Sequence, residues 1–386
     1  MKDDEFASRD LPHRLLMING LDITAHGAAL ELQNYPGAMV GHRMLSLQLP
    51  SDDCLPEGTE QMPERLRRFG LRVGLMLWLF PHLLRRLRHV DAVLFYGVDL
   101  QMLVLTLLAA RITRTPVFNE ITEHPHVLFA ASRYKRLGNF VYESLLLSRF
   151  KGMIVISSSL KRYVAEHAPL VPVHIMPPIA EYPVSQQTAN VLPGLFTYAG
   201  SLSEQKDGVI SLVEAFKAVH RVHPSARLRI FGHGPDSQRS MLNAKIDSLG
   251  LNDAVQLRPS VARGELMLAL AESDVLVHCR PSSKQATYGF PTKLAEYLSC
   301  GRPVVTTNTS DLACYLDDHA SAFLVPPDDT AAFAQAMLAT LADRDMADSV
   351  GARGRQVFDT SFRASAVVAK LGAWIGARLR DHAGKR

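Results

Sequence analysis

Short apolar runs alternate with longer segments of helical periodicity along most of the chain, and this rhythm constrains the fold more than any other feature. In the first half, the runs at 14–19, 92–96, 117–119 and 152–157 have the length and composition of buried strands. In the second half, the runs at 195–199, 227–231, 254–257, 275–278, 303–306 and 322–325 repeat the pattern. Strands separated by helices pair in parallel, so the sequence predicts an α/β fold with doubly wound parallel sheets.

The rhythm pauses between 176 and 194, where Pro177, Pro178, Pro183 and Pro193 stand among polar residues. Proline lacks an amide donor and cannot extend a regular element, so we expect an interdomain linker there. The chain of 386 residues also exceeds the size at which one core usually keeps growing. We therefore expect an N-terminal domain over 1–185 and a C-terminal domain over 190–362. The segment 363–386, helical in its periodicity up to 380, is expected to pack back on the first domain.

Composition narrows the possible functions. The chain is 47% hydrophobic and 21% charged, which is typical of a globular protein. A net charge of +4 is too small to indicate a nucleic-acid partner. The cysteines follow no paired or metal-ligand spacing, which favours a reducing compartment. The segment 1–10 is polar and lacks the apolar core of a secretory signal, so we expect a cytoplasmic protein.

Candidate binding residues lie in three turns of the second domain, because ligands of open parallel sheets bind beyond the carboxyl ends of the strands. The first turn holds Gly200 and Ser201, with Lys206 one short loop away as a cation for phosphate. Taken alone, it is more typical of a tight turn with a solvated lysine. The second turn holds Gly232 and Gly234. It lacks the third glycine and the acidic residue of a dinucleotide fingerprint, which disfavours a dehydrogenase.

The third turn, at 288–298, combines an anion site with a carboxylate. Pro291 suits the first turn of a helix, which would leave the amides of Thr292 and Lys293 pointing outwards at an anion. Glu296 follows about one turn later, where sugar or ribose hydroxyls would be suitable donors to a buried carboxylate. The alternative is a structural ion pair of Glu296 with Lys293 or Arg302.

Four segments of the second domain occur in a characteristic order. They read Tyr-Ala-Gly-Ser-Leu-Ser-Glu-Gln-Lys-Asp-Gly at 198–208, Phe-Gly-His-Gly-Pro at 231–235, Gly-Phe-Pro-Thr-Lys-Leu-Ala-Glu-Tyr-Leu at 289–298 and Cys-Gly-Arg-Pro-Val-Val at 300–305. As a set, they resemble the donor domain of the group 1 family of retaining GT-B glycosyltransferases over about 195–362. The resemblance implies two Rossmann-like domains that face a central cleft and close over a UDP- or GDP-linked sugar.

The resemblance also implies roles for individual residues. Lys206 would meet the donor diphosphate, and Glu296 would bind the nucleotide ribose. The amides near Thr292 and Lys293 would hold the distal phosphate. The further candidate contacts to the donor lie at the same strand ends and turns, and they are Gly200, Ser201, Gly232, Gly234, Arg258, Pro259, Ser260, Tyr288, Gly289 and Phe290. Of these, the segment 258–260 would lie near the base.

Two positions depart from the family pattern. Ser201 stands where the family usually has an arginine, and Tyr288 stands where it usually has a glutamate, eight positions before Glu296. The first departure removes a phosphate cation, and the second puts the usual contact to the donor sugar in doubt. Two alternatives to glycosyl transfer therefore stay open. One is a sensor that binds a sugar nucleotide or a polysaccharide, and the other is a further sugar-nucleotide enzyme such as an epimerase.

The first domain resembles the family more loosely, through Gly27 and the segment 119–125, and is expected to hold a saccharide or lipid-linked acceptor. Glu123 and His124 are candidates for orienting an acceptor hydroxyl, although a charged surface loop is at least as good an interpretation. With Lys206 and Glu296 they complete the predicted catalytic set. The chain has no Asp-x-Asp motif and no His/Cys cluster, so we expect no bound metal ion and no cofactor. The resemblance implies a hexosyltransferase that retains the anomeric configuration without a metal.

The region 65–88 mixes basic residues with the apolar run 74–80. Its arginines are Arg65, Arg67, Arg68, Arg72, Arg85, Arg86 and Arg88. Such mixing suits the surface of an anionic bilayer, and an ordinary helix packed on the first sheet is an equal alternative. The run is shorter than the about 20 residues that span a bilayer. A peripheral position on the cytoplasmic face would fit a role in lipopolysaccharide, cell-envelope or exopolysaccharide assembly.

Overall fold

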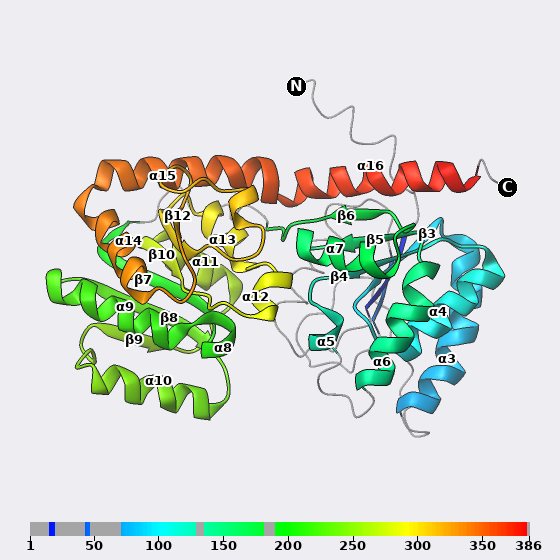
Figure 1. Ribbon diagram of the computed structural model, residues 1–386, viewed down its shortest axis with the longest axis horizontal. Helices are drawn as coiled ribbons and strands as arrows, with labels where there is room; N and C mark the ends of the chain where they lie inside the picture. Colours follow the sequence, from blue (N-terminus) through cyan, green and yellow to red (C-terminus); the bar gives the residue numbers. More distant parts are fainter. Residues whose placement is uncertain (1–14, 20–42, 47–70, 129–134, 181–189, 384–386) are drawn as a thin grey trace. The chain divides into compact units, whose positions relative to one another are not determined.

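The computed structural model describes residues 15–19, 43–46, 71–128, 135–180 and 190–383 (Figure 1). The chain divides into two compact units, which are Met1–Pro177 with Ala364–Arg386, and Pro178–Arg363. Each unit is built on a parallel sheet. The prediction of an α/β fold with two doubly wound parallel sheets is therefore confirmed.

The first unit has a parallel sheet in the order β2-β1-β3-β4-β5-β6 among its described residues. The strands are β1 (Leu15–Asn19), β2 (Arg43–Ser46), β3 (Ala92–Tyr96), β4 (Val117–Ile121), β5 (Gly152–Val155) and β6 (Val173–Ile175). The helices are α3 (Leu71–Arg86), η1 (Leu87–His89), α4 (Leu100–Thr113), α5 (Pro125–Leu128), α6 (Lys135–Val141), η2 (Tyr142–Leu146), η3 (Leu147–Arg149), α7 (Ser158–His167) and α16 (Ala364–Ala383). Strands β2 and β6, which are short and lie at the two edges of the sheet, were not predicted from the sequence.

Helices pack on both faces of this sheet, and successive residues of β4 show how. Phe118 faces α16, where its ring lies 5.7 Å from the ring of Trp374. Asn119 points the other way and accepts a hydrogen bond of 2.6 Å from the Tyr142 hydroxyl of η2. Neighbouring residues of a strand point to opposite faces, so the central strands are buried on both sides. Trp374 also packs so closely on β5 that a side chain at Gly152 would overlap it.

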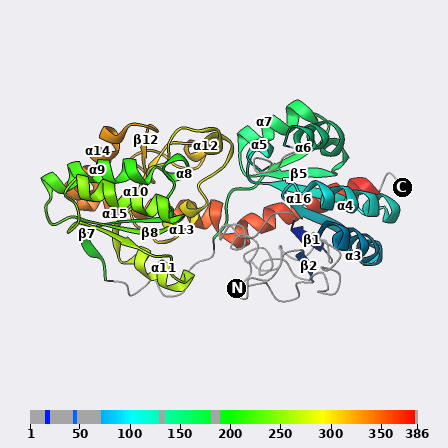
Figure 2. The same ribbon diagram turned by 90° about the horizontal axis from the view of Figure 1, so that it is seen from below.

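The second unit has a parallel sheet in the order β12-β11-β10-β7-β8-β9 among its described residues. The strands are β7 (Leu192–Ser201), β8 (Arg227–His233), β9 (Val255–Arg258), β10 (Ser273–His278), β11 (Val304–Thr307) and β12 (Phe323–Val325). The helices are α8 (Glu204–Asp207), α9 (Val209–Val222), α10 (Asp236–Ser248), α11 (Arg263–Ala271), α12 (Lys284–Tyr288), α13 (Lys293–Ser299), η5 (Leu312–Cys314), α14 (Thr330–Ala342), α15 (Arg344–Val357) and η6 (Phe358–Phe362). Helices α9, α10 and α14 cover one face, and α11 lies on the other (Figure 2).

The start of β7 differs from the prediction, which placed Pro193 in the linker and began the strand at 195. The strand begins at Leu192, whose amide donates to the carbonyl of Glu272 at 2.9 Å. Proline is tolerated here because β8 joins β7 only from Leu195 onwards, so the strand has one neighbour at Pro193. The first strand of the second unit therefore begins earlier than the prolines indicated.

Candidate functional site

The order of strands in the second unit marks a ligand-binding position between β7 and β10. Chain connections run from β7 towards β8 and β9, and from β10 towards β11 and β12, so the strand order reverses between these two neighbours. Open α/β sheets bind ligands beyond the carboxyl ends of the strands at such a reversal. The carboxyl ends in question are Ser201 of β7 and His278 of β10.

Gly200 and Gly232 lie within paired strands at this edge, because β7 and β8 continue further than the sequence pattern indicated. The two glycines are register partners. A side chain at Gly232 would overlap Leu202, which packs over the strand end. A side chain at Gly200 would overlap the ammonium group of Lys293. The space that Gly200 leaves is therefore filled by a lysine from α13, a role the sequence analysis did not foresee.

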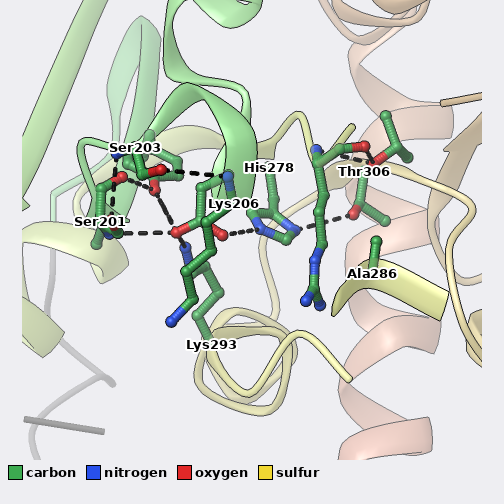
Figure 3. A network of polar contacts seen from close by, with 12 residues as sticks. Ser201, Ser203, Lys206, His278, Ala286, Lys293 and Thr306 are labelled. Atoms are coloured by element: carbon green, nitrogen blue, oxygen red, sulfur yellow. Dashed lines mark hydrogen bonds and ion pairs between the residues drawn. The ribbon is translucent and has the colours of Figure 1, made fainter. Parts of the chain in front are cut away.

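Asp207 is the centre of a polar network that joins three elements. Figure 3 shows its partners Ser201, His278 and Lys293. Its Oδ2 atom accepts from Lys293 Nζ at 2.9 Å, from the Tyr198 hydroxyl at 3.0 Å and from the Ser201 amide at 3.2 Å. Its Oδ1 atom lies 3.4 Å from His278 Nε2. Because α8 carries Asp207, the network links the end of β7, the end of β10 and the start of α13 at one point.

The charges of this network stabilise one another. Burial alone would raise the pKa of the Asp207 carboxyl, but the charge of Lys293 and the hydrogen bonds from His278 and Lys293 outweigh it and hold that pKa far below its usual range. For Lys293, burial lowers the pKa, and the contact with Asp207 opposes the shift. Asp207 is therefore a buried carboxylate whose negative charge depends on Lys293.

His278 completes the network as a neutral donor. Burial, followed by the nearby charge of Lys293, lowers its pKa to about 4, so the ring is uncharged near pH 7. Since a carboxylate can only accept, the proton of the neutral ring lies on Nε2 and points at Asp207. The other nitrogen, Nδ1, lies 3.5 Å from the hydroxyl of Thr306 and accepts from it. This arrangement fixes the ring between β10 and β11.

Lys206 lies beside Asp207 on α8 and is exposed. The Ser203 hydroxyl accepts from the Lys206 amide at 3.3 Å, and so caps this short helix. Gly208 ends the helix with φ +64°, and a side chain there would overlap the carbonyl of Cys279. Figure 3 shows the side chains of Lys206 and Lys293 at this same network, and the charge of Lys206 lowers the pKa of Lys293. Two cations therefore converge beside the end of β7.

Glu296 lies on α13 with a side chain that is 20% exposed. Its Oε1 atom is 3.6 Å from Nη2 of Arg263, the first residue of α11. The alternative partners considered from sequence, Lys293 and Arg302, make no ion pair with it among the described residues. Burial raises the pKa of the Glu296 carboxyl, and the charge of Arg263 opposes the shift. A half-buried carboxylate that lies 3.6 Å from Arg263 can still accept further hydrogen bonds.

The turn before α13 follows helix α12. That helix ends at Tyr288, and Gly289 adopts an extended conformation that any residue can take. The Phe290 ring is buried against the rings of Phe362 and Tyr315. This packing fixes the turn in place.

Helix α13 begins at Lys293 with Thr292 as its N-cap, two residues after Pro291. The first amides to bond within the turn are those of Leu294 and Ala295. Pro291 therefore precedes the helix and does not lie in its first turn, while the amides of Thr292 and Lys293 stand at the helix start.

The remaining donor-side candidates lie at the ends of β8 and β9. Gly234 and the segment 258–260 are exposed. The loop from β9 leads within a few residues to Arg263, and the contact of Arg263 with Glu296 brings this loop to α13. The structure thus joins the ends of β7, β9 and β10 with the start of α13 in one region.

The acceptor-side candidates lie in the first unit, after β4. His124 is buried, with its ring 5.1 Å from His126 and 4.8 Å from Tyr163. Its Nδ1 atom accepts from the His126 amide at 3.1 Å. Glu123 is half-buried beside it. The interpretation of this segment as a charged surface loop does not hold for His124, while Gly27 lies outside the described residues.

Asp207, His278 and Tyr198 are functional candidates that the sequence analysis missed. Asp207 directly follows Lys206, and His278 is a polar residue at the end of the apolar run 275–278. The sequence feature that could have indicated His278 is a polar residue at the end of a buried strand, where ligands of parallel sheets bind. Among the described residues, no helix combines the length and the apolar character needed to span a membrane, and no three His, Cys, Asp or Glu side chains are grouped as metal ligands.

Comparison with known proteins identifies the second unit. Residues 193–343 match the family model of the glycosyl transferases group 1. An exopolysaccharide phosphotransferase of Streptomyces coelicolor is 32% identical over 160 residues, which are 40% of this chain and 16% of that protein. The WcaL protein of Salmonella typhimurium, named as a colanic acid biosynthesis glycosyltransferase, is 29% identical over 173 residues. These are 43% of this chain and 41% of that protein, so the chain covers less than half the length of both relatives.

Solved structures extend the likeness to both units. HepE of Anabaena, solved in complex with UDP, matches 94% of this chain and 99% of its own with a TM-score of 0.73. The sequences are 15% identical, so this likeness shows the fold alone. The GT-B fold expected from the sequence is thereby confirmed. The chain thus has the GT-B fold, and its residues 193–343 match the glycosyl transferases group 1.

Proposed function

We propose that the chain transfers a hexose from a nucleotide-sugar donor to a saccharide or lipid-linked acceptor, with retention of configuration. The observation that carries the proposal is the convergence of Lys206, Lys293 and Glu296 at the point where the strand order reverses. The names of the relatives, which refer to exopolysaccharide and colanic acid, support a role in cell-envelope or exopolysaccharide assembly.

The two lysines are proposed to bind the donor diphosphate. Negative charge grows on the leaving phosphate as its bond to the sugar breaks, and cations fixed beforehand stabilise that charge without reorganising. Lys293 is held by Asp207, whereas Lys206 is exposed and forms no ion pair with any described residue. In this proposal Lys293 takes the place of the arginine that the family usually has at position 201, so Ser201 need not mean loss of activity. Transfer would then proceed without a metal ion.

The nucleoside is proposed to bind towards α13 and the end of β9. The carboxylate of Glu296 would accept hydrogen bonds from the ribose hydroxyls, which offsets the cost of its burial. The segment 258–260 would lie near the base, which is uracil or guanine in this proposal. Gly200, Ser201, Gly232, Gly234, Gly289, Phe290 and Tyr288 would line or shape the donor site.

The acceptor is proposed to bind to the first unit, with Glu123 and His124 orienting its hydroxyl. That oxygen attacks the anomeric carbon from the face that the diphosphate leaves, and its proton passes to the departing phosphate oxygen. Bond formation on the same face retains the configuration and requires no protein nucleophile. His124 is suited to a positioning role because its ring is held between His126 and Tyr163.

Product analysis distinguishes this proposal from its alternatives. UDP and GDP are first screened by thermal unfolding, because a ligand that binds only the native state raises the melting temperature. At a ligand concentration of a hundred times Kd, the gain in folding stability is about 2.7 kcal/mol. The matching nucleotide sugars are then incubated with lipid-linked and free saccharide acceptors. We expect release of nucleoside diphosphate together with a longer saccharide. Binding without release would indicate a sensor, and a changed sugar in the absence of acceptor would indicate an epimerase.

A further inference from the structure

Helix α4 has an apolar outer face. Its side chains are apolar almost all the way round, with Gln101, Thr106, Arg111 and Thr113 as the exceptions. A helix that covers a sheet normally turns a polar face to water, and an all-apolar helix is normally buried on every side. Yet Val104, Leu108 and Ile112 are 37%, 50% and 60% exposed. They recur every four residues, so they form one stripe along the helix.

Helix α3, the neighbour of α4, also carries exposed apolar side chains. The two helices pack against each other along the same sheet (Figures 1 and 2). Their carboxyl ends are joined by a hydrogen bond of 3.0 Å from the Thr115 hydroxyl to the Leu87 carbonyl. On α3, Met76 and Leu77 are more than half exposed. We call the exposed side chains of Met76, Leu77, Val104, Leu108 and Ile112 the α3–α4 face.

The charge at the carboxyl ends of the two helices is positive. Exposed arginines there are Arg85, Arg88, Arg111 and Arg114. Between 76 and 116 the acidic residues are Asp91 and Asp99, and the Asp99 carboxylate is used in capping α4 through the Met102 amide at 2.8 Å. The part of the region 65–88 that the structure describes thus keeps its basic character, while Arg65, Arg67 and Arg68 lie outside the described residues.

We propose that the α3–α4 face docks on the surface of an anionic lipid bilayer. The apolar stripe would enter the boundary between headgroups and acyl chains, and the arginines would contact lipid phosphates. The positive charge favours a bilayer over a second copy of the chain as the partner. In a symmetric dimer through this face, the same arginines of both copies would come together and repel each other. The proposal is independent of sugar transfer, since it involves no residue of the donor site.

Co-sedimentation of the full chain with vesicles tests this surface. We expect binding to vesicles with 30 mol% phosphatidylglycerol in phosphatidylcholine, and weaker binding to phosphatidylcholine alone or in high salt. Replacing Arg85, Arg88 and Arg111 by serine should lower the affinity for anionic vesicles about a hundredfold, since each basic residue near the surface contributes roughly a fivefold factor. The apolar variant Val104→Ser/Leu108→Gln/Ile112→Gln should lower it at least tenfold.

Matched controls come from the second unit. The variant Val222→Ser/Met241→Gln/Leu268→Gln also removes exposed apolar side chains, and Arg221→Ser removes an exposed arginine. Both should bind vesicles like the unaltered chain, and melting curves should show that every variant is folded. Equal vesicle binding by the face variants and the controls would overturn the proposal. So would a dimer in light scattering that the apolar variant converts to a monomer, because the face would then be a subunit interface.

Discussion

Replacing Lys293 by methionine is expected to weaken the binding of nucleoside diphosphate about tenfold to a hundredfold. This range corresponds to the loss of one charge-assisted hydrogen bond, roughly 1.5 to 3 kcal/mol. The variant should also lose about 3 to 5 kcal/mol of folding stability, because it leaves the carboxylate of Asp207 buried without its cation. Calorimetric titration with the nucleoside diphosphate and with the unphosphorylated nucleoside measures the first effect, and denaturant unfolding measures the second.

A double variant separates these two effects. Asp207→Asn combined with Lys293→Met removes the buried charge together with its partner, so most of the stability should return while diphosphate binding stays weak. Affinity for the unphosphorylated nucleoside should not change in either variant. Lys217→Met on α9 removes an exposed lysine and should alter neither quantity. If the double variant bound nucleoside diphosphate as tightly as the unaltered chain, Lys293 would be only a structural partner of Asp207.

Replacing Glu296 by alanine is expected to weaken nucleotide binding about tenfold to a hundredfold and nearly to abolish transfer, with the fold intact. The reason is the loss of a charge-assisted acceptor for the ribose hydroxyls. An exposed ion pair at helical spacing would contribute only about 0.3 to 0.5 kcal/mol, so a purely structural role predicts almost no change. Titration and a transfer assay on the same variant measure both quantities.

Two controls distinguish the ribose contact from the pair with Arg263. Arg263→Ala removes the partner and keeps the carboxylate, so nucleotide binding should fall much less than in Glu296→Ala. Glu265→Ala removes an exposed carboxylate from the same helix as Arg263 and should have no effect. Equal losses in Arg263→Ala and Glu296→Ala would mean that the ion pair, and not a contact to ribose, is the function of Glu296.

The sequence predicted the two sheets because buried parallel strands leave a local signal, a short apolar run between helical segments. It missed β2 and β6 because strands of three or four residues at a sheet edge carry too little of that signal. The donor-side turns were predicted because glycines, lysines and Glu296 follow the ends of apolar runs in the sequence. Their partners were not found, since Asp207 and Lys293 are 86 residues apart and meet only through the strand order.

Exposure of an apolar helix is a second property that the sequence could not supply. The pattern of α4 is that of a helix buried on all sides, and only the packing of the first unit reveals that Val104, Leu108 and Ile112 face outwards. The same limit applied to His124, whose position in a polar segment indicated a surface loop. Its burial against Tyr163 depends on α7, almost forty residues further along the chain.

A crystal structure of the chain with its nucleoside diphosphate tests the placement of the donor site most directly. We expect the diphosphate within hydrogen-bonding distance of the ammonium groups of Lys206 and Lys293, beside the end of β7. The ribose hydroxyls should donate to the carboxylate of Glu296, with the base near 258–260. A nucleotide bound in the first unit, or one in the second unit with its ribose away from α13, would contradict the account.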